Sequence, residues 1–88
     1  MAEVAMTFSV LPEDTDSSIE DLIKRLREKI EGKAKVAETS VQEIGFGLKK
    51  IKMVVIVKDQ DGQQDMIEEL ASSVDGVGQV DFEDASLV

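Results

Sequence analysis

Three lysines, Lys49, Lys50 and Lys52, stand close together in a strongly acidic chain. They follow residues 44–47, in which two glycines flank a phenylalanine. The spacing Gly-Phe-Gly-Leu-Lys-Lys matches neither glycine-rich nucleotide fingerprint, so it does not predict a phosphate-binding loop. Two interpretations of the lysines stay open. They either solubilise the open face of a sheet, or they form a basic patch that meets an acidic partner surface.

The residue types exclude several kinds of catalytic chemistry. The chain has no histidine and no cysteine, so it lacks a histidine base for a serine nucleophile and the usual His/Cys metal ligands. Its carboxylates are numerous, but no pair has the spacing of an acid/base couple. We therefore predict a binding or regulatory protein rather than an enzyme, with no cofactor and no metal site.

Size and charge limit the function further. A chain of 88 residues indicates a single domain, residues 1–88. A net charge of −9 repels phosphate backbones, which argues against binding to nucleic acid. No apolar run reaches the roughly 18 residues of a membrane span, and the N-terminus lacks the features of a signal peptide. We expect a soluble cytoplasmic protein without a membrane partner.

Four segments have the patterns of strands. Alternating apolar residues predict a strand over 3–11, which ends before the proline. Residues 44–57 predict one long central strand, whose two glycines suit a bulge or a close backbone approach. The weaker segment 33–41 suits an edge strand, with a hairpin connection at residues 40–43. Residues 77–82 predict the last strand.

Two segments have helical periodicity. Ser17 and Glu20 form a capping-box pattern before a helix that runs to about residue 31, and Gly32 suits the left-handed residue after it. Residues 63–73 predict a second helix. The order strand–helix–strand–strand–helix–strand predicts a ferredoxin-like α+β sandwich. Its four-stranded antiparallel sheet has the order 4-1-3-2, with both helices on one face.

This fold supports many functions, so other functional classes stay open. An RNA-recognition module would need stacking aromatics on the open face, but the aromatic residues are only Phe8, Phe46 and Phe82, and the net charge is unfavourable. A small-molecule-binding regulatory module, paired edge to edge as a dimer, is the main alternative to a protein that acts on another protein.

Several stretches resemble a known family. They are similar to segments of the archaeal elongation factor 1-beta family. The four stretches are Val4-Ala5-Met6-Thr7-Phe8-Ser9-Val10-Leu11-Pro12-Glu13, Glu43-Ile44-Gly45-Phe46-Gly47-Leu48-Lys49-Lys50-Ile51, Met66-Ile67-Glu68-Glu69-Leu70 and Val74-Asp75-Gly76-Val77. The resemblance covers nearly the whole chain and implies the same ferredoxin-like fold. It also implies guanine nucleotide exchange on elongation factor 1-alpha during translation elongation, without covalent chemistry, by a protein that is a monomer when free.

The resemblance also implies which residues touch the partner. In this family the loop before the long strand and the C-terminal end belong to the contacting surface. Eukaryotic members carry a penultimate lysine that reaches toward the Mg²⁺ site, where this chain has Leu87, and an aromatic residue where it has Val41. The expected partner-binding residues are Val41, Ile44, Gly45, Phe46, Gly47, Lys49, Lys50 and Leu87.

Overall fold

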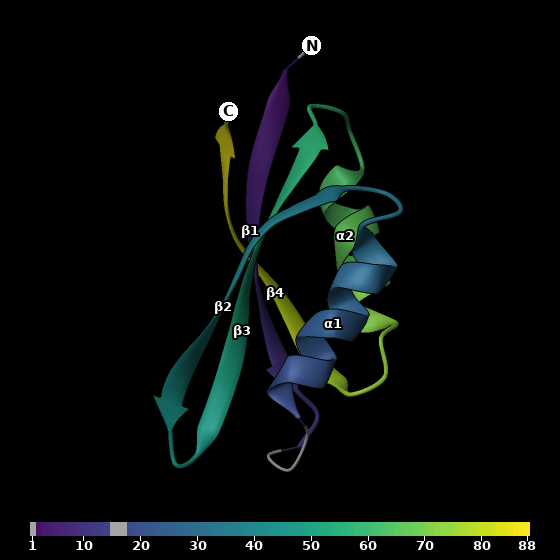
Figure 1. Ribbon diagram of the computed structural model, residues 1–88. Coiled ribbons are helices and arrows are strands. Elements are labelled where there is room, and N and C mark those ends of the chain that lie inside the picture. Colours follow the sequence, from purple (N-terminus) through teal and green to yellow (C-terminus); the bar gives the residue numbers. More distant parts are fainter. Residues whose placement is uncertain (1, 15–17) are drawn as a thin grey trace.

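Six helices and strands make up the chain in the computed structural model, which describes residues 2–14 and 18–88 (Figure 1). They are β1 (Glu3–Pro12), α1 (Ile19–Ile30), β2 (Lys35–Gly45), β3 (Leu48–Lys58), α2 (Gln63–Ser72) and β4 (Val77–Leu87). The strands form one antiparallel sheet in the order β2-β3-β1-β4, and both helices cover the same face of it. The structure confirms the predicted ferredoxin-like α+β fold and its strand order.

The hydrophobic core lies between the helices and one face of the sheet. Phe8 lies opposite Met53 in the pairing of β1 with β3, and Val10 lies opposite Ile51. All four side chains are fully buried because alternate residues of a strand point to the same face. The helices contribute buried residues at helical spacing, namely Leu22, Leu26, Ile30, Ile67 and Ala71. The alternation in the first strand and the helical spacing in both helices thus turn one apolar side of each element toward the core.

The β2–β3 hairpin differs from the prediction. Residues 40–43, predicted as the connection, pair with residues 49–52 of β3, and the turn lies at residues 45–47. All three turn residues have positive φ, which sharply reverses the chain. A Cβ added at Gly45 or Gly47 would meet nothing within 4 Å, so the expected close backbone approach is absent there. The expected bulge agrees with the pairing, which shifts register between Glu43 and Gly45, and both glycines also serve the turn.

The ends of the elements show smaller differences. The N-cap of α1 is Ser18, whose Oγ accepts the N–H of Asp21 at 3.3 Å. Ser17, the predicted cap, lies outside the described residues. Gly32 does not have a positive φ, so the predicted left-handed cap is wrong; instead the N–H groups of Lys33 and the next residue both donate to the Ile30 carbonyl. These bonds close the helix end without a left-handed residue.

Strands β1 and β4 also extend beyond their predicted limits. β1 continues through Pro12, where the pairing with β4 changes register; proline is tolerated at such an irregularity. β4 continues to Leu87 and runs along most of β1. In the described part of the chain, neither helix is long and apolar enough to cross a membrane.

Candidate protein-binding site

The β2–β3 hairpin projects beyond the helices at the end of the molecule opposite both termini (Figure 1). We call residues 44–49 the hairpin tip. On this hairpin Val41, Ile44, Phe46 and Leu48 are large apolar side chains exposed to solvent, whereas Val36 at its base is buried. Apolar residues that cluster on a projecting end of a small domain indicate a contact surface for another molecule.

The turn holds Phe46 away from the rest of the chain. Its φ is 56°, between Gly45 at 96° and Gly47 at 76°. A bulky residue other than glycine is uncommon in this left-handed region and raises the energy of the backbone there. The side chain is 103% exposed, so no packing in the domain offsets that cost. Strain of this kind is concentrated at functional sites, which makes Phe46 the first candidate for an anchor residue.

A cleft of about 590 Å³ lies behind the tip, between the end of β1 and the start of α1. Leu11 and Ile19 supply apolar wall on the side of the domain, and Ile44 and Leu48 supply it on the side of the hairpin. Lys49 also lines the cleft. Glu13 and Glu20 also line the cleft, so the tip and the cleft form one continuous surface with apolar and acidic parts at this end of the molecule.

The lysines do not form one patch. Lys49 has the same strand parity as buried Ile51, so it lies on the side of the sheet that carries the helices, and it faces the cleft. Lys50 and Lys52 lie on the open face. Within the described residues no ion pair joins Lys49, although Glu43 is its direct neighbour across the hairpin. Lys49 is thus the lysine whose charge is available at the tip.

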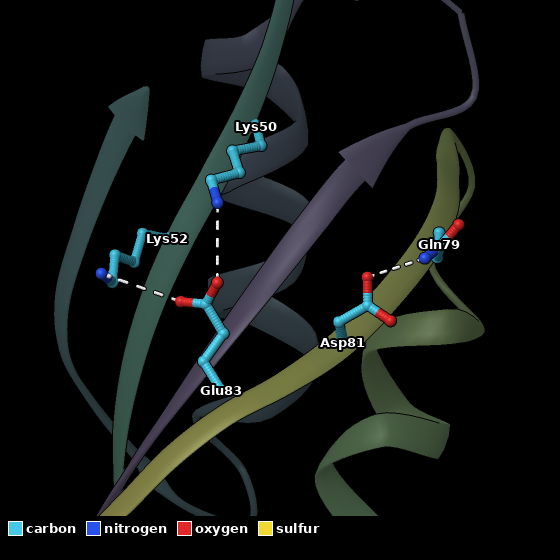
Figure 2. A network of polar contacts seen from close by, with 5 residues as sticks. All are labelled: Lys50, Lys52, Gln79, Asp81 and Glu83. Atoms are coloured by element: carbon cyan, nitrogen blue, oxygen red, sulfur yellow. Dashed lines mark hydrogen bonds and ion pairs between the residues drawn. The ribbon is translucent and has the colours of Figure 1, made fainter. Parts of the chain in front are cut away.

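Lys50 and Lys52 are held by a carboxylate of β4 (Figure 2). Lys50 Nζ lies 3.5 Å from Glu83 Oε2, and Lys52 Nζ lies 3.7 Å from Glu83 Oε1. Glu83 falls at a β-bulge, because Phe82 pairs with Phe8 and the next paired residue of β4 is Asp84. The extra residue lets its side chain reach over β1 to β3.

The pKa of the Glu83 carboxyl is lowered from its ordinary value. The Ser9 hydroxyl contributes most to this lowering, the charges of Lys50 and Lys52 contribute less, and partial loss of hydration opposes them. Among the described residues, however, the buried Ser9 Oγ has no partner at hydrogen-bond distance. The Ser9 hydroxyl therefore lowers the pKa of Glu83 as a nearby polar group, whereas Lys50 and Lys52 contact the carboxylate directly.

We expect Glu83 to titrate below the ordinary glutamate range in an NMR pH titration. Since the folded pKa is the lower one, the stabilisation is present above the unfolded pKa and is lost as pH falls through the folded pKa. Replacing Lys50 and Lys52 by glutamine should raise the pKa, and Ser9→Ala should raise it too. Added salt should weaken the lysine effect because the pair is exposed. An unchanged pKa in all variants would contradict this assignment.

The structure separates one expected site residue from the others. Leu87 pairs with Val4, and the N–H of Val88 donates to the carbonyl of Glu3, so the C-terminal end lies far along the sheet from the hairpin tip. Leu87 is exposed, but it does not share a surface with Phe46. Ile44, Gly45, Gly47 and Lys49 do lie with Phe46 at the tip, and Val41 lies further along the same hairpin.

Leu48 belongs to this surface and was not among the expected residues. The sequence pattern that could have identified Leu48 is the alternation of inward and outward residues along β3. The buried residues of β3 are Ile51, Met53, Val55 and Val57, so Leu48 has the parity of the lysines on the open face rather than that of the core. At the start of the strand, beyond the helices, it contributes apolar surface to the cleft.

Comparison with known proteins identifies the family of the chain. Residues 5–88 match the family model described as the EF-1 guanine nucleotide exchange domain. The chain is 39% identical to elongation factor 1-beta of Thermoplasma acidophilum and 40% identical to that of Thermoplasma volcanium, over 100% of each chain. It is 40% identical to elongation factor 1-beta of Pyrobaculum aerophilum over 83 residues, which are 93% of this chain and 90% of the relative. The chain therefore belongs to the elongation factor 1-beta family of guanine nucleotide exchange domains.

Proposed function

We propose that the hairpin tip is the surface through which this chain promotes exchange of GDP for GTP on elongation factor 1-alpha. The observation that carries the proposal is Phe46, a fully exposed aromatic residue held in a left-handed turn on a projecting hairpin. An aromatic side chain that has no contacts within its own domain gains most when a partner buries it. Family membership supplies the class of activity.

The mechanism requires only differential binding. An exchange factor that binds the nucleotide-free form of the G protein more tightly than the GDP-bound form must weaken GDP binding by the same factor. In our proposal Phe46 enters an apolar site on the G protein, and Ile44 and Leu48 cover the contact around it. Lys49 adds attraction to an acidic partner surface and speeds encounter. No covalent bond of the nucleotide is made or broken.

The remaining expected contacts have separate places in the proposal. Lys50 is held by Glu83 on the open face and would have to exchange that carboxylate for a partner group. Leu87 lies at the far end of a molecule whose longest dimension is 42 Å, so it would form a second contact only with a partner that spans this length.

The wider setting is also part of the proposal. Residues 1–88 act as one exchange domain and as a monomer when free, in the cytoplasm. The net charge of −9 supports the absence of direct binding to nucleic acid or to acidic membranes. In the described chain no group of three or more potential ligand residues could hold a metal ion, so any Mg²⁺ involved would be held by the G protein and its nucleotide.

The test is release of a fluorescent GDP analogue from elongation factor 1-alpha. The chain, at a tenth of the concentration of the G protein, should accelerate release when unlabelled GDP is added in excess. A thermal melt of the same sample shows that the chain is folded. Release at the spontaneous rate with folded chain would overturn the proposed function.

A further inference from the structure

Three strands bring four polar groups together on the open face of the sheet. Ser9 of β1 lies opposite Lys52 of β3, Lys50 lies two residues before Lys52 on the same face, and Glu83 comes from the bulge of β4. Figure 2 shows both lysine side chains directed to the Glu83 carboxylate from β3. This cluster is on the face opposite the helices, and no part of the proposed exchange activity uses it as a unit.

The cluster contains one donor that its carboxylate does not reach. Each oxygen of Glu83 contacts one lysine, at 3.5 Å from Lys50 and 3.7 Å from Lys52. The Ser9 Oγ is inaccessible to solvent, and in the described part of the chain it has no hydrogen-bond partner. A buried hydroxyl without a partner is costly, and it calls for an explanation such as a missing ligand.

We propose that Ser9, Lys50 and Lys52 form a binding site for a phosphate group, which Glu83 occupies when no phosphate is bound. A phosphate has three acceptor oxygens beyond its ester or hydroxyl oxygen, so it can accept from both ammonium groups and from the Ser9 hydroxyl at once. In this geometry the Glu83 carboxylate contacts both lysines, while the Ser9 hydroxyl beside it makes no hydrogen bond within the described residues.

Displacement of Glu83 is energetically accessible. Both ion pairs are long and partly exposed, with 25–40% of each side chain accessible, and such pairs contribute little to stability. The bulge leaves Glu83 outside the register of paired residues, so its side chain can turn away without breaking the β1–β4 pairing. Another acid on this face, Asp81, lies opposite Ser9 and accepts a hydrogen bond from Gln79 at 2.7 Å.

The test uses the full chain labelled with ¹⁵N and titrated with inorganic phosphate at constant ionic strength. We expect saturable amide shifts centred on Ser9, Lys50, Lys52 and Glu83, which sodium chloride does not produce. Glu83→Gln should raise phosphate affinity about five- to tenfold, because the ion pairs no longer compete. The matched control Glu69→Gln makes the same change in net charge on α2 and should leave the affinity unchanged.

Further variants separate a site from general electrostatic attraction. Lys50→Gln with Lys52→Gln should abolish the shifts, and Ser9→Ala should weaken binding while the melting temperature stays close to that of the unmodified chain. A titration with phosphoserine shows the source of the group: equal binding assigns the site to a phosphate ester, and binding of inorganic phosphate alone assigns it to the free ion. Equal gains in Glu83→Gln and Glu69→Gln, or shifts spread over the whole surface, would overturn the proposal. Since this assay contains no G protein, its failure leaves the exchange proposal untouched.

Discussion

Replacing Phe46 by alanine is expected to slow catalysed GDP release from elongation factor 1-alpha by roughly thirtyfold, the effect of losing about 2 kcal/mol at a central anchor residue. The free energy of unfolding should change by less than about 0.5 kcal/mol, because the side chain is fully exposed and packs against nothing in the domain. The measurements are fluorescent-GDP release and urea unfolding on the same preparations.

Two further variants make this result specific. Phe46→Leu keeps an apolar side chain and the same demand on the backbone, so it should retain part of the activity. Glu69→Ala removes an exposed side chain from α2, which is not part of the hairpin, and should leave exchange unchanged. If Phe46→Ala exchanges at the normal rate, the hairpin tip is not the contact surface.

Replacing Phe8 by alanine is expected to lower the free energy of unfolding by about 3–5 kcal/mol, the usual cost of deleting a buried aromatic side chain. Phe8 is fully buried at the centre of the sheet, and its ring meets that of Phe82 edge-on with centroids 5.6 Å apart. Since small domains are stable by only about 5–15 kcal/mol, this change should bring the protein close to unfolding at ordinary temperature. Urea unfolding at 10 °C measures it.

The aromatic pair can be separated from simple burial. Phe82 is only half-buried, so Phe82→Ala should cost less than Phe8→Ala. A double-mutant cycle should give a coupling of about 0.5–1.5 kcal/mol for the edge-on contact. A loss below 1 kcal/mol in Phe8→Ala would contradict the place we assign to it at the centre of the core.

The contrast between Phe46 and Phe8 separates function from stability. One variant should lose exchange and keep its fold, and the other should lose its fold first. The two residues have the same side chain, so the difference comes entirely from their surroundings. A protein that acts through a projecting hairpin can change the tip without a large effect on the core.

The sequence identifies the segment Gly45-Phe46-Gly47 as part of the candidate site, but it does not determine the conformation of this segment. Glycines within an apolar run fit a bulge, a close approach or a turn equally well. The choice depends on how far β2 pairs with β3, which is set by contacts between residues distant from the turn. The run of lysines misleads for a related reason, since neighbours in a strand point to opposite faces.

Period-two and helical spacing of apolar residues determined the element order, the strand order and the inward faces, because each element must bury one side and right-handed crossovers leave few arrangements. The absence of histidine and cysteine excluded a histidine base and the usual His/Cys metal ligands, and this too follows from the sequence alone. Only the tertiary structure decided that the turn holds Phe46 in solvent, that Glu83 reaches Lys50 and Lys52 across β1, and that Leu87 lies at the other end. Those facts depend on pairing register and on a bulge, which join residues that are far apart in the chain and leave no local signal.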